Sequence, residues 1–202
     1  MLELLMKQKF NDQHIQLLTH AFENDPMFDT LFKGINKHRQ MKAMFNFIYK
    51  RNQLMQGIYL TDSEENPSYV AFIEQPKNQH KVALINVFRL IVEMFKLVFN
   101  IPIKSLIYLS QYDAITTRNR PRENHYYLTM IGISVTKQGQ GIGKEIINKI
   151  HQIVINDKEV TMICLDTENK NNVTYYQQFG YKLIKEINVK DLQIYCMTLK
   201  KI

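Results

Sequence analysis

Three glycines stand close together in the segment Gln138–Lys144, whose sequence is Gln-Gly-Gln-Gly-Ile-Gly-Lys. Because glycine has no Cβ, the backbone at these positions can approach another group closely. The first turn of the helix expected after this segment leaves N–H groups without partners and carries a partial positive charge. Such a turn is suited to binding a phosphate or pyrophosphate through main-chain amides. The segment indicates an anion-binding turn, and a tight turn without a ligand is the alternative.

Two common phosphate-binding signatures do not match this segment. A dinucleotide-binding fingerprint requires a third glycine three residues after the second, where this chain has Lys144. A Walker A loop requires a glycine five residues before a Gly-Lys-Ser/Thr triplet, and Gln138 and Glu145 occupy the two deciding positions. What remains is Gln-x-x-Gly-x-Gly, directly after an apolar run that ends at Val135.

A second segment with chemically useful side chains lies downstream, at Leu165–Tyr181. Asn169 and Asn172 precede Tyr176 by seven and four residues, and Phe-Gly-Tyr ends the segment. With the glycine turn, this segment resembles motifs A and B of the GNAT superfamily of acyl-CoA-dependent N-acyltransferases. The resemblance covers about residues 125–181. The spacing of the asparagines is similar to that of small-molecule acetyltransferases of the puromycin-modifying type.

The resemblance implies an α/β (α+β) fold with a mixed, mostly antiparallel central sheet of about six to seven strands flanked by helices. It implies a single domain over residues 1–202, with a cofactor-binding core at about 125–181. The region at about 81–118 is the least similar to the family. We interpret it as a helical insertion before the fourth strand.

The resemblance also implies that acetyl-CoA is the acyl donor and that its pantetheine arm lies between two splayed parallel strands. The main chain at Ile133 and Val135 would bond the arm, and the N–H groups of Gly139 to Lys144 would hold the pyrophosphate. The Gln138 side chain would brace the turn or reach a phosphate. The cofactor-binding residues expected on this basis are Ile133, Val135, Gln138, Gly139, Gln140, Gly141, Ile142, Gly143, Lys144, Asn169, Asn172 and Tyr176. Asn172 could instead cap the short helix that follows.

Tyr176 matches the family tyrosine that stands near the thioester sulfur. A phenol of pKa about 10 can donate a proton to a thiolate whose thiol has a pKa of about 8.5, so we expect Tyr176 to be the general acid. His125 begins the central strand, and the imidazole group in general titrates near neutral pH, which makes this residue a candidate base. Glu74, Asp166 and Glu168 near strand ends are other candidates, and ordered water is a further one. No metal site emerges from the sequence.

The expected reaction is transfer of the acetyl group of acetyl-CoA to a primary amine of a small molecule or an exposed amino group. We expect direct attack in a ternary complex, since no cysteine or serine is placed to carry the acyl group. The alternative is a non-catalytic acyl-CoA-binding or regulatory module with a degenerate acceptor site. A nucleic-acid-binding protein is the third interpretation.

Composition limits these alternatives. The 202 residues include 26 Lys and Arg against 19 Asp and Glu, a net charge of +7 that suits a polyanionic cofactor. No basic run interleaved with aromatics occurs, so we expect no nucleic-acid partner. Val82–Leu109 is the longest apolar region, and charged residues and Pro102 interrupt it, so no membrane span is expected. Two isolated cysteines, Cys164 and Cys196, and the lack of a signal-peptide core predict a cytoplasmic protein. A homodimer is left open.

Hydrophobic periodicity predicts the elements that position these residues. The central strand, Tyr126–Val135, is apolar on both faces, with Tyr127, Ile131, Ile133 and Val135 on one and Leu128 and Met130 on the other. In the insertion, we expect Met94 and Phe95 to be core residues. A second possible role for them is to form a wall of the acceptor pocket. The expected helices are one capped by Asn11 or Asp12 and ended by Asp25-Pro26, then Lys37–Leu54, Val82–Phe99, Ile103–Thr117 and Lys144–Ile155. The other expected strands are Gly57–Thr61, Ser68–Ile73, Val160–Leu165, Tyr181–Val189 and Leu192–Leu199.

Overall fold

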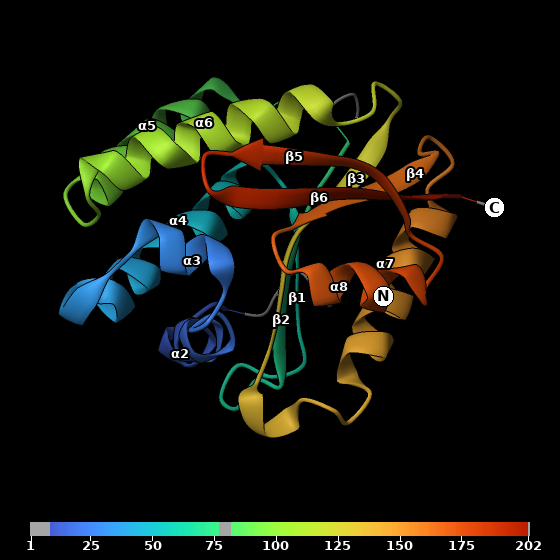
Figure 1. The fold of residues 1–202 in the computed structure, drawn as a ribbon, viewed down its shortest axis with the longest axis horizontal. Helices are drawn as coiled ribbons and strands as arrows, with labels where there is room; N and C mark the ends of the chain where they lie inside the picture. The colour runs from blue at the N-terminus through green and yellow to red at the C-terminus, as the bar shows by residue number, and fades with distance from the viewer. Residues whose placement is uncertain (1–8, 77–81, 202) are drawn as a thin grey trace.

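A six-stranded sheet in the order β1-β2-β3-β4-β6-β5 organises residues 9–76 and 82–201, which the computed structural model describes (Figure 1). The pair β3–β4 is parallel, and the other four pairs are antiparallel. The expected mixed, mostly antiparallel sheet is therefore confirmed. The strands are β1 (Ile58–Thr61), β2 (Tyr69–Glu74), β3 (His125–Ile133), β4 (Met162–Thr167), β5 (Lys182–Val189) and β6 (Leu192–Lys200).

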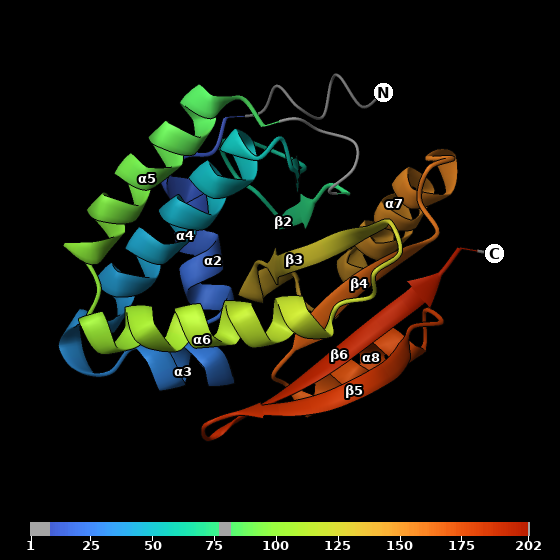
Figure 2. The ribbon, with the colours of Figure 1, turned by 90° about the horizontal axis from the view of Figure 1, so that it is seen from above.

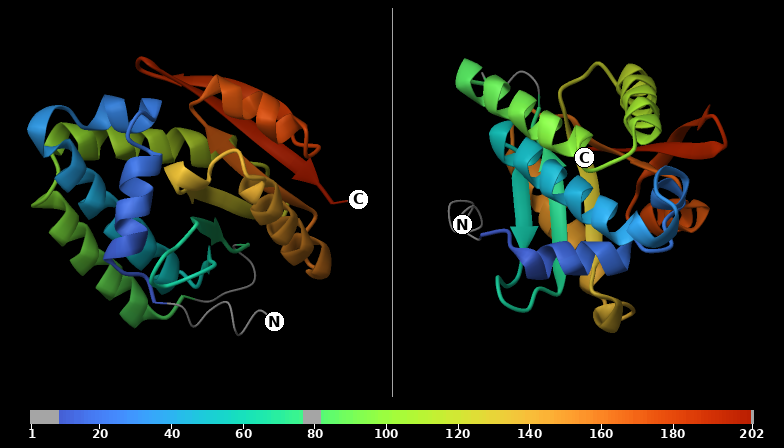
Figure 3. Two further views of the ribbon diagram at one scale, coloured as in Figure 1. Left: turned by 90° about the horizontal axis from the view of Figure 1, so that it is seen from below. Right: turned by 90° about the vertical axis from the view of Figure 1, so that its left-hand side faces the viewer.

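Helices cover both faces of this sheet, as Figures 1 and 3 show. One face packs against α2 (Asp12–Ala21), α3 (Pro26–Leu31), α4 (Lys37–Leu54), α5 (Leu84–Val98) and α6 (Ile103–Asn119), together with the short 3-10 helix η1 (Gly34–Asn36). The other face packs against α7 (Ile142–Asn156) and α8 (Lys170–Gln177). Each face has its own apolar core, so the sheet is buried on both sides, as two-faced apolar strands require.

Side-chain caps start α2 and α3. Asn11 accepts a hydrogen bond from the Gln13 amide at 3.0 Å and forms a capping box with His14. Asp25 accepts from the amides of Met27 and Phe28, which starts α3 with proline at its first position. The prediction that Asp25-Pro26 only ends a helix missed α3, because the same pair also favours a new helix start.

A β-bulge at Thr129 reverses the alternation of side chains along β3. Phe72 pairs with Met130 and Ile73 pairs with Leu128, which leaves Thr129 without a residue opposite. As a result Ile131 packs in the same core as Leu128, and Met130 packs in the other core. The prediction that grouped Ile131 and Ile133 with Tyr127 was wrong, since one extra residue moves every later side chain to the opposite face.

Beyond the bulge, β3 and β4 separate. They pair only from His125–Leu128 to Met162–Leu165, whereas β3 stays paired with β2 up to Ile133 and β4 with β6 up to Thr167. Figure 2 shows the two strands diverging from a common start. The splay that the resemblance implied is therefore present.

Strand β3 ends at Ile133, and Val135 begins the 3-10 helix η2 (Val135–Lys137), so the predicted strand end was wrong. The Lys137 amide donates to the Ser134 carbonyl at 2.8 Å, which turns the chain there.

The region expected to be an insertion folds into α5 and α6, between β2 and β3, so within the described residues it precedes the third strand and not the fourth; Lys81 lies outside those residues. The expectation that Met94 and Phe95 belong to the core was wrong. Leu97 is the one fully buried residue of α5, and both Met94 and Phe95 are exposed. The helix packs on α4 through its other side, where Asn86 Nδ2 donates to the Leu54 carbonyl at 3.1 Å. Periodicity identified an apolar stripe but not which neighbour, if any, covers it.

Gly132, next to the splay, allows β3 to pack closely on α2. A Cβ there would lie 2.5 Å from Leu18 Cδ2, and Leu18 is fully buried. We expect Gly132→Ala to lower the free energy of unfolding by about 1–3 kcal/mol in urea titrations. Combining it with Leu18→Ala should relieve part of the steric overlap. The double variant should therefore lose less free energy of unfolding than the sum of the two single variants. Strict additivity would contradict this contact.

Candidate active site

The glycine turn presents unobstructed main-chain amides at the start of α7. Gly139 and Gly141 have φ angles of 76° and 85°, a left-handed conformation that favours glycine. Gly141 is the N-cap of α7, and no side chain caps the helix. A Cβ at either glycine would meet nothing within 4 Å. The first-turn amides of a 15-residue helix therefore face open space, which fits an anion.

Side chains of the turn stabilise it from within. Gln138 Nε2 donates to the Ile133 carbonyl at 3.3 Å, and Gln140 Nε2 donates to the Thr136 carbonyl at 3.1 Å. Of the two roles expected for Gln138, the structure contains the bracing one. Gly143 has a different function, because a Cβ there would collide with the Tyr175 hydroxyl of α8. The third glycine thus brings α8 close to the turn.

A cavity of about 460 Å³ occupies the space where β3 and β4 separate. Residues 128–131 of β3 and residues 165–168 at the end of β4 line it, with Asn172 and Tyr176 of α8. Apolar side chains from the helices of the other face complete the wall, among them Phe28, Met44, Met94, Leu97, Leu106 and Leu109. The insertion therefore forms a wall of the cavity next to the splayed strands.

Glu168 is the carboxyl group in this cavity with a pKa near neutrality. Burial raises its pKa to about 7; the hydrogen bond from the Tyr112 hydroxyl opposes that rise, and Asp25 and Asp166 add to it. A carboxylate with this pKa can accept a proton from an ammonium group at neutral pH. The residue lies two positions before the start of α8, on the same wall as Tyr176.

Tyr176 keeps its proton in this setting. Burial raises the pKa of its hydroxyl well above the ordinary value, and the neighbouring Tyr175 and Glu168 raise it further. The ring packs edge-on against Tyr175 and Tyr181, with centroid distances of 5.9 and 5.5 Å. A protonated phenol held in one orientation beside the splay fits a proton donor.

The two asparagines before Tyr176 have separate structural roles. Asn169 is the N-cap of α8 and accepts from the Asn171 amide at 3.0 Å. Asn172 donates through Nδ2 to Thr167 Oγ1 at 3.1 Å and lines the cavity. The suggestion that Asn172 caps the helix was wrong, because the cap lies three residues earlier.

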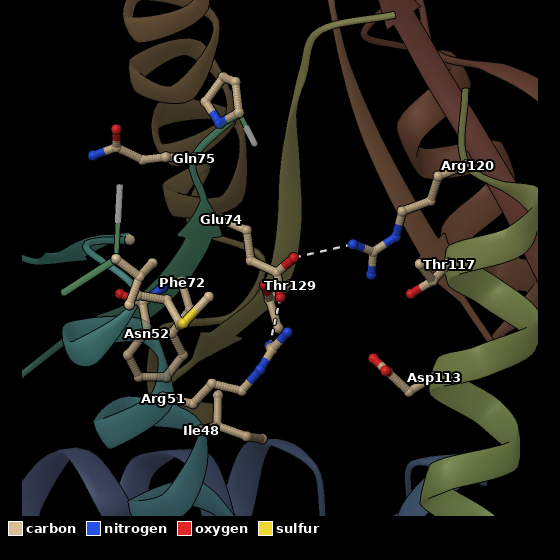
Figure 4. Close-up of a pocket in the computed structure, with 14 residues that line it drawn as sticks. Ile48, Arg51, Asn52, Phe72, Glu74, Gln75, Asp113, Thr117, Arg120 and Thr129 are labelled. Carbon is tan, nitrogen blue, oxygen red and sulfur yellow. Dashed lines mark hydrogen bonds and ion pairs between the residues drawn. The ribbon is translucent and has the colours of Figure 1, made fainter. Parts of the chain in front are cut away.

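The other carboxylate candidates are held in ionic and hydrogen-bonded pairs. Figure 4 shows Glu74 between Arg51 and Arg120, at 2.5 and 3.0 Å. Burial alone would raise the pKa of Glu74, but the two guanidinium groups outweigh it and hold the pKa below the ordinary value. Asp166 accepts from the Tyr127 hydroxyl at 2.7 Å, and burial raises its pKa. Glu74 stays ionised and paired, which makes it a poor proton acceptor.

His125 is not brought to the cavity. It lies at the start of β3 opposite Met162, where β3 and β4 are still paired, and its Nδ1 is 2.7 Å from the Glu123 carbonyl. It is absent from the lining of the two described cavities. The suggestion that His125 is the base stays a prediction without support from this geometry.

Cysteine and metal chemistry gain no support within the described ranges. Cys164 and Cys196 are free and buried, and burial raises the pKa of the Cys164 thiol to about 12. A thiol with this pKa is not a nucleophile at neutral pH.

Over residues 9–76 and 82–201, no three His, Cys, Asp or Glu side chains gather where they could hold a metal ion. In the same ranges, no helix is long and apolar enough to cross a bilayer.

Comparison with known proteins identifies the family. Residues 104–200 match the family model described as an acetyltransferase (GNAT) domain. This match identifies residues 104–200 as a GNAT acetyltransferase domain. The matched region begins in the first turn of α6 and contains the turn, the splayed strands and α8, whereas α2 to α5 precede it.

Two solved structures illustrate the likeness in fold. The crystal structure titled histone acetyltransferase HPA2 and related acetyltransferase, from Corynebacterium glutamicum, is 21% identical, with a TM-score of 0.62 over 92% of this chain and 88% of that one. Ard1 from Thermoplasma volcanium is 8% identical, with a TM-score of 0.54 over 96% of each chain. At these identities the likeness shows the fold. The GNAT family supports acetyl transfer in general, with acetyl-CoA as its usual donor.

Sequence reasoning missed two features of the site. The hydrogen bond from Tyr112 to Glu168 joins the insertion to motif B across 56 positions, and no local pattern announces it. The Arg51–Glu74–Arg120 cluster joins three elements in the same way. The one available signal was position, since Glu168 directly follows a buried strand that precedes the Asn-rich helix start.

Two glycines with nearly the same backbone strain allow a matched test of the turn. Gly34 in η1 has a φ of 73° and, like Gly141, has open space around its Cβ direction. Each Gly→Ala change should destabilise the fold by about 1 kcal/mol. We expect Gly141→Ala to weaken coenzyme A binding at least about tenfold in calorimetry, because the amides lose their alignment. Gly34→Ala should leave the affinity unchanged. Equal affinities in the two variants would contradict an anion-binding turn.

Proposed function

We propose that the protein transfers the acetyl group of acetyl-CoA to a primary amine by direct attack in a ternary complex. The observation that carries this proposal is the cavity between the separated strands, with Glu168 and Tyr176 among its lining residues, together with the uncapped glycine turn that follows β3 in the chain. A donor, an acceptor, a proton acceptor and a proton donor can meet in this one space. The buried cysteines, with a raised pKa at Cys164, favour direct attack over an acyl-enzyme.

The residues that fit the donor are main-chain groups. The amides of residues 139–144 would hold the pyrophosphate, and the β4-facing edge of β3 near Ile133 would bond the pantetheine arm. Bound there, the donor supplies an activated thioester carbonyl. Asn172 lines the same cavity and is already oriented by Thr167, so its side-chain carbonyl oxygen remains available to accept a hydrogen bond.

Glu168 and Tyr176 would divide the proton transfers. Glu168 takes a proton from the amine as the nitrogen–carbon bond forms, and Tyr112 holds its carboxylate in place. As the carbon–sulfur bond breaks, Tyr176 donates its proton to the departing sulfur. The tyrosine recovers a proton from solvent or from Glu168 before the next turnover. This assignment replaces His125 with Glu168 as the base.

The walls of the cavity favour an amine with an apolar body. Phe28, Met44, Leu97, Leu106 and Leu109 surround the part of the cavity away from the turn. Burying an apolar substituent against them is favourable by about 25 cal/mol per Å². Polar groups are concentrated near the splay, which would place the amine there.

The free, buried cysteines support a reducing compartment such as the cytoplasm.

The direct test is release of coenzyme A from acetyl-CoA with a panel of primary amines. Amines with an apolar chain and amines of equal charge without one should be compared at the same concentrations. We expect release above hydrolysis, with a higher kcat/KM for the apolar members. Binding of acetyl-CoA without release for any amine would instead favour a non-catalytic acyl-CoA-binding module.

Glu168→Gln should lower kcat/KM by roughly 10²-fold, because general base catalysis contributes about this much. In the wild type, activity should rise with pH through about 7, the pKa of Glu168, and then level off. That rise should be absent in the variant.

Stability gives a second readout of the same group. The folded protein holds the Glu168 proton more tightly than the unfolded chain, so its contribution to stability is lost as pH rises through about 7. The melting temperature of the wild type should therefore fall relative to Glu168→Gln from about pH 5 to about pH 8.

If the rise of activity with pH were lost in His125→Gln and kept in Glu168→Gln, His125 would be the base.

Tyr176→Phe should lower kcat by roughly 10²-fold with little change in acetyl-CoA affinity, because the ring still packs but the proton is gone. Tyr175→Phe is the matched control, since it removes a hydroxyl from the neighbouring position of the same helix. Its kcat should stay within about threefold of the wild type. Similar rate losses in both variants would argue that packing of α8, and not the Tyr176 proton, limits the reaction.

A further inference from the structure

The outer side of α5 is a continuous apolar surface. Six side chains at helical spacing, which we name the α5 face, are 43–87% exposed: Leu84, Phe88, Ile91, Phe95, Val98 and Phe99. Figures 2 and 3 show α5 along the periphery of the molecule, with no described element outside it. The polar residues Asn86 and Glu93 lie on the opposite side, where α5 packs on the rest of the protein. The helix therefore has apolar side chains on its outward side as well as at Leu90 and Leu97, which line the cavity.

The α5 face is too large to be an ordinary surface feature. With a full side-chain area of about 200 Å², the six exposed fractions correspond to roughly 700 Å² of apolar surface. The largest apolar patch on a typical monomer is about 300–600 Å². Other exposed side chains, including Ile85 and Val92, extend it. A surface of this size calls for an occupant outside the chain.

The charges around this face favour an anionic occupant. Helix α4, which packs beside α5, has five Lys and Arg residues and no Asp or Glu; Lys37 and Arg51 are paired with Asp29 and Glu74, which leaves Arg39, Lys42 and Lys50. On α5 itself Arg89 and Lys96 are exposed, and the acidic Glu93 is paired with Lys96 at 2.8 Å. Lys104 adds a further exposed cation at the start of α6. A two-fold contact between copies would bring two such cationic surroundings together, which is unfavourable.

We propose that the α5 face docks the protein on the surface of an anionic lipid bilayer. The phenylalanine side chains would enter the boundary between headgroups and acyl chains, and the lysines and arginines beside them would meet lipid phosphates. This contact is interfacial, and at 15 residues α5 is too short to span a bilayer. It is independent of the proposed reaction, since Val98 is the only one of the six residues that lines the cavity.

The absence of tryptophan from the chain allows a direct probe. Phe95→Trp places a single indole in the α5 face, and its emission should shift to the blue on vesicles of phosphatidylcholine mixed with phosphatidylglycerol. Brominated lipids in the same mixture should quench it. Vesicles of phosphatidylcholine alone should give a much smaller response. An indole that keeps its emission on the anionic vesicles would overturn the proposal.

Sedimentation with the same vesicles tests which side chains are responsible. Phe88→Ser/Phe95→Ser should lower partitioning into the vesicles more than about tenfold, because it removes two aromatic side chains that the bilayer would bury. Ile184→Ser on β5, which is 57% exposed in the wild type, is the matched control and should partition like the wild type. The substituted side chains are all exposed, so circular dichroism should show intact folds.

Light scattering tests the alternative occupant, which is a second copy of the protein. A wild-type dimer in solution that becomes monomeric in Phe88→Ser/Phe95→Ser would show that a second copy covers the face, and would overturn the lipid proposal. A monomeric wild type that sediments with anionic vesicles supports it. Equal sedimentation of the double variant and the wild type would also overturn it.

Discussion

The separation of β3 from β4 is the constraint on which the site depends. The two strands share a ladder over four residue pairs, and each then stays with its outer neighbour. The bulge at Thr129 lies where the ladder ends, and it turns Ile131 toward the α7 core. An unpaired strand edge inside a protein must find other hydrogen-bond partners. The sheet therefore holds open a slot whose walls are main-chain groups, with the glycine turn directly after it.

The environments of the carboxyl groups around this slot separate their roles. Glu74 lies between two guanidinium groups and keeps its charge, whereas the nearest partner of Glu168 is the neutral Tyr112 hydroxyl. Burial acts on both, but only Glu74 has cations to oppose it. The difference comes from the helices, because Arg51 belongs to α4 and Tyr112 to α6. The separated strands form the slot, and Arg51 and Tyr112 from the helices set the charge states of its carboxyl groups.

The features that could be predicted from sequence are those encoded locally. The glycine turn, the Asn–Tyr spacing and the order of strands follow from residues adjacent in the chain, and the structure keeps that order. The bulge could not be read from β3, because both of its faces are apolar and either phase fits the pattern. The role of Glu168 depends on Tyr112, which is 56 positions away, so spacing could not reveal it. His125 was favoured for its chemistry, but its position places it where the strands are still paired.

The two sides of α5 face different physical requirements. Its inner side combines Leu90 and Leu97, which line the cavity, with the polar Asn86, which bonds the Leu54 carbonyl. On its outer side Phe88, Phe95 and Phe99 are 61–85% exposed and do not line the cavity, so polar residues at these positions would leave the wall unchanged and reduce the apolar surface exposed to water. Folding alone therefore does not account for phenylalanine at positions 88, 95 and 99. The outer sequence of this helix reflects an interaction beyond the fold, at the part of the chain that precedes the shared acetyltransferase core.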